Sequence, residues 1–316
     1  MLDVHRLRLL REVDRLGTLA AVARALSYSP SAISQQLSQL ESETGVRLLE
    51  PAGRGVRLTA QARILVAHTE RILQELEAAE AELRGSLTEV TGTLRVASFQ
   101  SVLLALVPAA LTLLARRHPG LRVEITHQEA GPAYEGVLAH EFDIVLGEEY
   151  PGLPQAPVQG VDAQLLARDE LLLAVPRHGR YARGGPDPSA PVALTELADV
   201  PWVLGPLETV PTQWARITCR NAGFEPDVRF ASPDLLLQVH LVETGHAAAI
   251  LPRLLLTDRS PAVRLSRLHG RPHRKLTTGV RAGATRHPAI RAFRDALRRA
   301  FRESGETGTG HHDDEH

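Results

Sequence analysis

Cysteine is almost absent from this chain, because Cys219 is the only one among 316 residues. A single thiol cannot form an internal disulfide framework, and it supplies too few ligands for a cysteine-rich zinc site. We expect it to serve as a small buried hydrophobe. Lysine is equally scarce, since Lys275 is the only one and nearly all positive charge comes from arginine.

The sequence also lacks any apolar run long enough to cross a bilayer. Its first ten residues interrupt their leucines with Asp3, His5, Arg6 and Arg8, which does not resemble a secretory signal. We therefore expect a soluble, cytoplasmic protein with no membrane partner.

Neither sign of charge dominates, since the formal net charge at pH 7 is -1. This balance excludes a histone-like protein that holds nucleic acid through overall positive charge, so any DNA contact must be local. With 43% hydrophobic and 23% charged residues, the composition is that of a globular protein, and the length predicts at least two folding units.

What is present divides into segments of different periodicity. Apolar residues recur at helical spacing over 2–58, and a single uninterrupted helical pattern follows over 60–87. Beyond residue 91, short apolar runs alternate with helical stretches, which indicates βαβ units on a mainly parallel sheet. The sequence therefore predicts a compact three-helix unit, a long linker helix and an α/β region of two similar lobes.

The most specific pattern is the segment 18–41, TLAAVARALSYSPSAISQQLSQLE. Thr18 can accept hydrogen bonds at a helix N-terminus, and the small alanines that follow allow a second helix to cross closely. Ser29 can cap that second helix, with Pro30 at its first position, where a missing N–H costs nothing. Its inward stripe is predicted at Ile33, Leu37 and Leu40.

The opposite surface of this second helix carries hydroxyl and amide groups at Ser31, Ser34 and Gln35, with Gln36 and Gln39 beside them. Such groups can reach base edges in the major groove or hold phosphate oxygens. A Gly-Arg-Gly turn follows, and it can place Arg54 at a hairpin tip beside the DNA backbone or in the minor groove. A solvated helix face and a plain β-turn are the simpler alternatives for the two patterns taken singly.

From helix to hairpin, the segment LAAVARALSYSPSAISQQLSQLESETGVRLLEPAGRGVRLTAQA resembles the LysR-type transcriptional regulator family. The resemblance continues in GTLRVASFQSVLLALVPAALTLLARRHPGLRVEI, EFDIVLGEE and VETGHAAAILPR. It implies an N-terminal all-α winged helix-turn-helix, a long linker helix and a C-terminal α/β two-lobed domain like the type 2 periplasmic binding proteins. The implied function is a sequence-specific transcription regulator that responds to a small-molecule effector. By position, the DNA contacts fall on Pro30, Ser31, Ser34, Gln35 and Arg54, and Thr18 and Ser29 complete the predicted DNA-binding set.

Two departures from the family pattern concern specificity. Many members have an arginine where this chain has Gln35, and a proline where it has Ser31. The aromatic and basic residues usual before the wing are replaced by Leu49 and Pro51. We therefore expect hydroxyl and amide contacts to dominate base reading.

The expected domain boundaries follow these segments. They are 1–59 for the DNA-binding domain, 60–90 for the linker and dimerisation helix, 91–303 for the effector-binding domain and 304–316 for a disordered polar tail. The first lobe is expected at about 91–162 and 267–303, and the second at about 163–266. The wide apolar stripe of the linker helix needs a partner, which is either its own domain or, as the resemblance implies, the same helix of a second subunit. The expected partners are operator DNA, a small effector, a second copy in a dimer or tetramer, and RNA polymerase.

The effector site is expected where the first strand of the α/β region ends, at Ser98, Phe99, Gln100 and Ser101. A helix begins there, and its free N–H groups with a hydroxyl nearby can bind a carboxylate or phosphate. Ser101 falls at the position that contacts an effector in several family members. Further candidates near strand ends, each of which could instead serve packing or capping, are Gln128, Gly147, Glu148 and Trp202. Glu148 would repel an anion but could pair with an amino or guanidino group, so the expected effector is an amino acid or another small carboxylate.

Two other classes of protein compete with this interpretation. A solute-binding protein would use the same two-lobed fold, but it would need an export signal and no DNA-binding motif. An enzyme would need a motif that is missing here, such as a phosphate loop, a dinucleotide fingerprint or a nucleophile elbow, and a catalytic Cys219 would need His240 or His246 beside it in space. No catalytic residue and no cofactor are predicted, and the terminal segment 311–316 is interpreted as a polar tail rather than a metal site.

Overall fold

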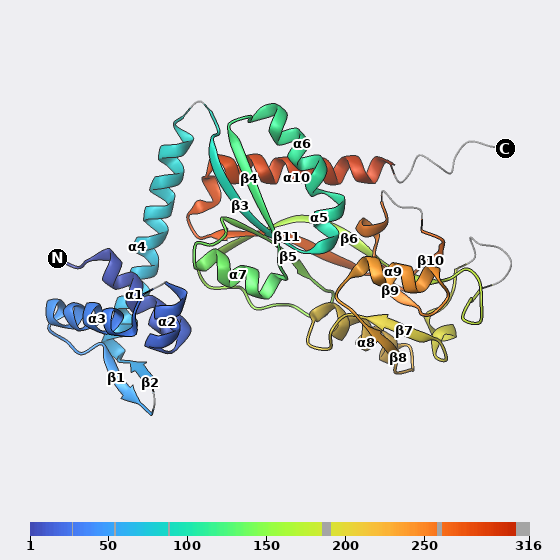
Figure 1. Cartoon of the computed structure of the whole chain (residues 1–316), viewed down its shortest axis with the longest axis horizontal. Coiled ribbons are helices and arrows are strands. Elements are labelled where there is room, and N and C mark those ends of the chain that lie inside the picture. The colour runs from blue at the N-terminus through green and yellow to red at the C-terminus, as the bar shows by residue number, and fades with distance from the viewer. Residues whose placement is uncertain (27, 54, 88, 185–190, 258–260, 308–316) are drawn as a thin grey trace.

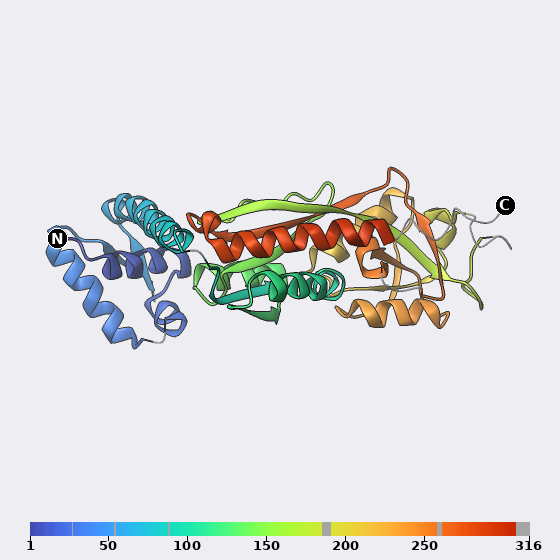
Figure 2. The same cartoon turned by 90° about the horizontal axis from the view of Figure 1, so that it is seen from above.

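The structure is a computed structural model. It describes residues 1–26, 28–53, 55–87, 89–184, 191–257 and 261–307. A small helical domain, one long helix and a larger α/β domain follow one another along the chain (Figure 1). Seen from above, they are arranged along one axis (Figure 2).

The N-terminal domain has three helices and a hairpin. The helices are α1 (Val4–Leu16), α2 (Leu19–Ala25) and α3 (Pro30–Thr44), and the hairpin strands are β1 (Leu49–Ala52) and β2 (Gly55–Leu58). The predicted inward stripe of α3 is confirmed, since its members are at most 1% exposed. They pack with apolar side chains of α1, α2 and the hairpin at Leu7, Leu9, Leu10, Val13, Val22, Leu48 and Leu58.

The linker helix α4 (Ala60–Gly85) carries the chain from the N-terminal domain to the α/β domain (Figure 1). Its N-terminal part packs on α1 through Ala62 and Val66, which belong to the core of the N-terminal domain. Several of its larger apolar side chains nevertheless stay exposed, namely Ile64, Ile72, Leu76 and Leu83. Among the described residues, no helix is both long and apolar enough to span a membrane.

The α/β domain is built on a seven-stranded sheet of the described residues, in the order β10-β6-β11-β5-β3-β4, with β9 also pairing with β6. These strands are β3 (Gly92–Ser98), β4 (Leu121–His127), β5 (Ile144–Glu149), β6 (Val161–Pro176), β9 (Ala249–Pro252), β10 (Val263–Arg267) and β11 (His273–Arg281). A separate parallel pair consists of β7 (Pro201–Leu204) and β8 (Asp227–Ala231).

Helices cover the sheet and complete the two lobes. They are α5 (Gln100–Ala105), α6 (Val107–Arg117), α7 (Ala130–Leu138), α8 (Val210–Asn221), α9 (Leu235–Glu243) and α10 (Pro288–Thr307). Short 3-10 turns are η1 (Leu194–Leu197), η2 (Arg253–Leu256) and η3 (Ala284–Arg286). α6 and α10 run side by side in both views, and their apolar faces share the core of the first lobe (Figures 1 and 2).

The prediction of a mainly parallel sheet is wrong. β3 is parallel to β4 and β5, but β11 is antiparallel to β5 and β6, and β6 is antiparallel to β9 and β10. The reason is that β6 carries the chain from the first lobe to the second, and β11 carries it back. These two neighbouring strands therefore run in opposite directions. The alternation of strands and helices along the chain does not reveal such long connections.

The lobe boundary expected between 162 and 163 falls inside β6. The first half of this strand pairs with β11, and Ala167 lies in the core of the first lobe. From Leu171 onward the strand pairs with β9 and β10, and Leu171 lies in the core of the second lobe. The chain therefore changes lobes near Glu170, in the middle of one continuous strand.

The predicted start of the polar tail, residue 304, is too early in the chain. α10 continues to Thr307, and its last turns are stabilised by an Arg299–Glu303 ion pair of 2.8 Å and by the Ser304 hydroxyl, which donates to the Phe301 carbonyl. An i,i+4 pair of this kind supports a helix end that is otherwise polar. Residues 308–316 lie outside the described residues.

The linker helix and the first lobe meet around Arg281, at the end of β11. Its guanidinium lies 2.8 Å from Glu77 of α4 and 3.3 Å from Asp143, and it donates to the Phe142 carbonyl. His140 contributes a ring nitrogen 3.7 Å from the same Glu77. A cavity of about 320 Å³ lies beside this contact, lined by Arg8, Arg11 and His140 among other residues of α1, α4 and the first lobe.

Acid is expected to weaken this contact between the domains. Burial, followed by repulsion from Arg281, Arg8 and Arg11, lowers the pKa of His140 to about 3, and the nearby Glu77 does not outweigh these effects. The unfolded chain therefore binds this proton more readily, so the stabilising contribution is complete above the ordinary value of 6.5 and is lost as the pH falls toward 3. When the pH is lowered from 7.5 to 5, the urea concentration at the midpoint of unfolding should fall less in His140→Gln than in the wild type. Parallel declines in the two proteins would contradict this role for His140.

Candidate DNA-binding surface and effector pocket

The N-terminal half of α3 presents a polar surface. The Ser29 hydroxyl caps the helix by accepting a hydrogen bond from the Ala32 N–H at 3.2 Å, and Pro30 occupies the first turn. Ser31, Ser34 and Gln35 are exposed on the same helix, opposite its buried stripe. This is the arrangement that a recognition helix needs, with its interior side held by apolar packing and its polar side free.

The other predicted DNA-binding residues have different local roles. Thr18 is exposed and caps α2 by accepting from the Ala21 N–H at 3.1 Å. Gln36, beside the polar surface of α3, is half-buried and accepts a hydrogen bond from the Arg6 side chain of α1 at 3.0 Å. Pairing of Ala52 with Gly55 confirms a tight hairpin, and Arg54 lies outside the described residues.

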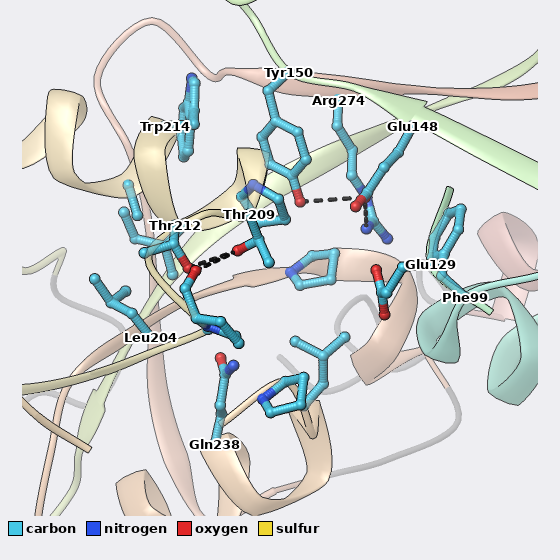
Figure 3. A pocket seen from close by; sticks show the side chains of 18 of the residues that line it. Phe99, Glu129, Glu148, Tyr150, Leu204, Thr209, Thr212, Trp214, Gln238 and Arg274 are labelled. Carbon is cyan, nitrogen blue, oxygen red and sulfur yellow. Dashed lines mark hydrogen bonds and ion pairs between the residues drawn. The ribbon is translucent and has the colours of Figure 1, made fainter. Parts of the chain in front are cut away.

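A cavity of about 280 Å³ lies between the two lobes of the α/β domain. Its wall is formed where β3 leads into α5, at the end of β5, at the start of α8 and at the start of α9, so both lobes contribute (Figure 3). The apolar part of the lining includes Phe99, Leu171, Leu204, Trp214, Leu235 and Ile250. We call this cavity the interlobe pocket.

Arg274 of β11 is the central charged residue behind this pocket. Its Nε and one terminal nitrogen lie 3.0 and 2.8 Å from Asp169, and its other terminal nitrogen donates to Glu148 at 2.6 Å. The Ser101 hydroxyl accepts a further hydrogen bond at 2.7 Å. Burial opposes the guanidinium charge, but Asp169, Tyr150 and Glu148 outweigh it and raise the pKa of Arg274 above its ordinary value. The group is therefore always a cation, and its charge is already balanced by protein carboxylates.

Tyr150 and Glu148 form the wall next to this arginine. The Tyr150 hydroxyl donates to the same Glu148 oxygen that Arg274 contacts, at 3.2 Å (Figure 3). Burial, followed by repulsion from Glu148, raises the pKa of Tyr150 well above its ordinary value of 10.0. The phenol therefore stays protonated and acts as a hydrogen-bond donor to the carboxylate.

Two family models match this chain. The first, described as "Bacterial regulatory helix-turn-helix protein, lysR family", matches residues 4–63. The second, described as "LysR substrate binding domain", matches residues 88–302, which is more than half of the chain. The chain belongs to the LysR family. This LysR regulator is thus a DNA-binding transcription regulator with an effector-binding domain. The expected domain architecture, a winged helix-turn-helix, a long helix and a two-lobed α/β domain, is confirmed.

Similar proteins extend over nearly the whole regulator. The probable transcriptional regulator LrrA of Synechococcus elongatus is 27% identical, and the alignment covers 97% of this chain and 100% of LrrA. TcbR of Pseudomonas sp. strain P51 is 26% identical, with 85% and 89% covered. Among solved structures, full-length CbnR in complex with its target DNA is 25% identical, with a TM-score of 0.52 and coverage of 95% and 99%. A full-length OxyR variant from Pseudomonas aeruginosa shares the fold at a TM-score of 0.62 and 19% identity, with 94% and 95% covered.

The structure brings three of the predicted effector residues of the LysR regulator to the pocket wall. Phe99, Gln100 and Glu148 line it. Ser101 lies behind the wall as an acceptor for Arg274, and Ser98 is fully buried with its hydroxyl directed to the Phe99 carbonyl.

The other three predicted residues do not line the pocket. Trp202 is 0% exposed and packs in the core of the second lobe, where its ring N–H points to the Leu197 carbonyl. Gly147 is buried against Tyr134, whose hydroxyl would overlap an added Cβ. Gln128 is half-buried, and its backbone N–H continues the sheet by donating to the Ser98 carbonyl. A position near a strand end was thus a poor guide, because it does not reveal which side of the sheet a residue faces.

Several pocket residues were missed by sequence reasoning. They are Glu129, Tyr150, Thr209, Thr212, Trp214, Gln238 and Arg274. For Thr209 a signal existed, because it precedes Val210 and Pro211 at a helix start, where free N–H groups are common. For Arg274 there was none, since its partners come from three elements far apart in the sequence.

Proposed function

We propose that this LysR regulator binds its operator through Ser31, Ser34 and Gln35 of α3, and that a small molecule in the interlobe pocket controls its action on transcription. The observation that carries the DNA-binding part is the exposed polar start of α3, which is capped by Ser29 and held from behind by a fully buried stripe. Hydroxyls and amides in this position suit base edges and phosphates. The wing, with Arg57 exposed on β2, would add contacts to the backbone.

The exposed apolar side chains of α4 support assembly with a second copy. Ile64, Ile72, Leu76 and Leu83 lie on a helix of 26 residues, and each of them is 38–71% exposed. Pairing of two such helices would bury these side chains and place two recognition helices at two half-sites of a nearly palindromic operator. A regulator of this kind would act in the cytoplasm, where the bacterial chromosome lies.

Binding without catalysis is the proposed use of the α/β domain. The thiol considered as a nucleophile, Cys219, is 0% exposed in the core of the second lobe. Burial, followed by repulsion from Glu225, raises the pKa of Cys219 to about 12, so it stays a thiol at neutral pH. The N-terminal family match to residues 4–63 separates this chain from a solute-binding protein, which needs no DNA-binding domain.

The proposal is tested by a gel-shift titration with the DNA upstream of the chain's own gene. The wild-type protein should shift this fragment well below the concentration at which it shifts a random duplex. Gln35→Ala should weaken operator binding by about 1–3 kcal/mol while leaving random-duplex binding unchanged, as loss of a base contact does. Gln155→Ala, on an exposed loop of the α/β domain, is the matched control. An equal loss on both duplexes would contradict a base-reading role for Gln35, and no preference for the upstream fragment would contradict its use as the operator.

A further inference from the structure

The guanidinium and amide nitrogens that reach the interlobe pocket each have an acceptor within the protein. Every guanidinium nitrogen of Arg274 has a protein acceptor within 3.0 Å. The Gln100 amide N–H donates to Asp234 at 2.8 Å, and the same amide oxygen accepts from the Leu235 N–H at 2.7 Å. The Gln238 amide N–H donates to the Ser232 carbonyl at 2.8 Å.

The Thr209 hydroxyl at the start of α8 is in the same situation. Its proton is directed to the Pro206 carbonyl oxygen at 2.8 Å and to the Thr212 hydroxyl at 3.0 Å, both of which accept. Thr209 therefore presents lone pairs to the pocket, whereas Thr212 accepts from Thr209 and keeps its own proton as a neutral donor.

Acceptors remain free in the same wall. Glu129, at the start of α7, has neither an ion pair nor a side-chain hydrogen bond with the described residues. At Glu148, one oxygen takes both the Arg274 and the Tyr150 contacts, which leaves the second oxygen available. At Gln238 the amide oxygen has no donor among the described residues, although the residue is only 5% exposed. In Figure 3 the Glu129 and Glu148 side chains lie on the same side of the pocket, next to Phe99.

The lining of the interlobe pocket carries more negative than positive charge. Among the described lining residues, Glu129, Glu148 and Glu208 face a single cation, Arg274, which Asp169 also neutralises from behind. Burial, followed by repulsion from Glu148, raises the pKa of Glu129, and His127 opposes this only weakly. An entering cation would relieve that repulsion, whereas an entering carboxylate would increase it.

We propose that the effector carries a protonated nitrogen, as an amine, amidine or guanidine, which binds between Glu129 and Glu148. The rest of the molecule is apolar and lies against Phe99, Leu204 and Trp214, because the lining there is apolar and the volume of about 280 Å³ suits a compact body. The Arg274 guanidinium carbon already lies over the Phe99 ring, 5.5 Å from the ring centroid. The part of the pocket beside Phe99 is therefore compatible with a cation. This inference rests on the proposed function of the pocket. The effector expected from the sequence is an amino acid or another small carboxylate; this inference keeps the amino group of that expectation and departs from its carboxylate.

The test uses probes that are matched in shape and differ in charge. Full-length protein is titrated with phenethylamine and hydrocinnamate, with benzamidine and benzoate, and with hexylamine and heptanoate. Thermal unfolding and calorimetry report binding, because a ligand that prefers the folded state raises the unfolding temperature. At least one cation should raise this temperature and bind about 10- to 100-fold tighter than its anionic match, which is the range of a hydrogen bond to a charged group.

A variant pair localises the effect. Glu129→Gln should weaken binding of that cation about 10-fold or more, because the amide keeps the shape and removes the charge. Glu135→Gln, exposed on the same helix and outside the pocket lining, should leave the affinity unchanged. Binding of the cation should also weaken as the pH is lowered from 8 to 5, and this dependence should be smaller in Glu129→Gln.

Three results would overturn the inference: anions that bind as tightly as their cationic matches, cation affinity that is unchanged in Glu129→Gln, or no stabilisation by any of the three cations. The same protein preparation is assayed in parallel for the operator shift. A retained shift together with any of these results rejects the effector class alone, whereas a lost preference for the operator rejects the proposed function itself.

Discussion

Arg274→Met is expected to lower the free energy of unfolding of the effector-binding domain by about 3–5 kcal/mol, the range found when one partner of a buried ion pair is removed. Arg274 is 2% exposed and connects β11 to β6 through Asp169, to β5 through Glu148 and to α5 through Ser101. Methionine keeps much of the volume but leaves the buried Asp169 carboxylate without its cation. The loss is measured as the shift of the urea midpoint of the full-length protein.

The neighbouring residue provides a matched control for this variant. Lys275 pairs with Glu149 at 3.0 Å, but the two side chains are 48% and 36% exposed. Such a surface pair contributes about 0–1 kcal/mol, because water and salt screen it. Lys275→Met should therefore change the midpoint little. Similar losses in the two variants would contradict the view that Arg274 holds the lobe junction through buried charge.

Gly283→Ala is expected to separate the linker helix from the first lobe and to cost about 2–5 kcal/mol, as the sum of a backbone and a steric contribution. Gly283 has a φ of +93°, in the left-handed region that favours glycine. An added Cβ would also overlap the Gln74 carbonyl oxygen of α4 and come within 3.2 Å of the Ala78 nitrogen. Because both are backbone atoms, α4 itself would have to move.

Gly270→Ala separates the two contributions. Gly270 has a similar φ of +72°, but nothing lies within 4 Å of an added Cβ. Gly270→Ala should therefore lower the free energy of unfolding only by the backbone contribution, about 1–2 kcal/mol. The two variants are compared by urea unfolding of the full-length protein. If Gly283→Ala lost no more than Gly270→Ala, close packing of η3 on α4 would not contribute to stability.

The DNA-binding surface was predictable because its determinants are local. A hydroxyl cap, a proline in the first turn and an apolar stripe at helical spacing all lie within twelve residues, from Ser29 to Leu40. Each of them acts through the backbone of one helix, so the sequence order alone shows which side faces inward. The contact of Gln36 with Arg6 could not be predicted in this way, because Arg6 belongs to another helix.

The lining of the interlobe pocket was only partly predictable, for the opposite reason. Glu148 and Phe99, which were predicted from their places after strands, line the pocket, whereas Trp202 lies in the core, because a strand position does not reveal which face of the lobe a residue serves. Arg274 and Asp169 are 105 residues apart, and they meet because β11 and β6 pair in a register that sets them directly opposite. A register shift of one residue would turn Arg274 to the other face of the sheet.

The amino-acid sequence by itself determined the family, the winged helix-turn-helix with its exposed Ser31, Ser34 and Gln35, the linker helix and the two-lobed α/β class. Helix periodicity, caps and turns depend on neighbours along the chain, and that is why they could be recognised there. Only the tertiary structure decided the antiparallel connections between the lobes and the charge of the interlobe pocket. It pairs Arg274 with Asp169 and Glu148 and leaves Glu129 without an ion pair among the described residues, because cross-strand register and the packing of two lobes bring together side chains that the sequence keeps far apart.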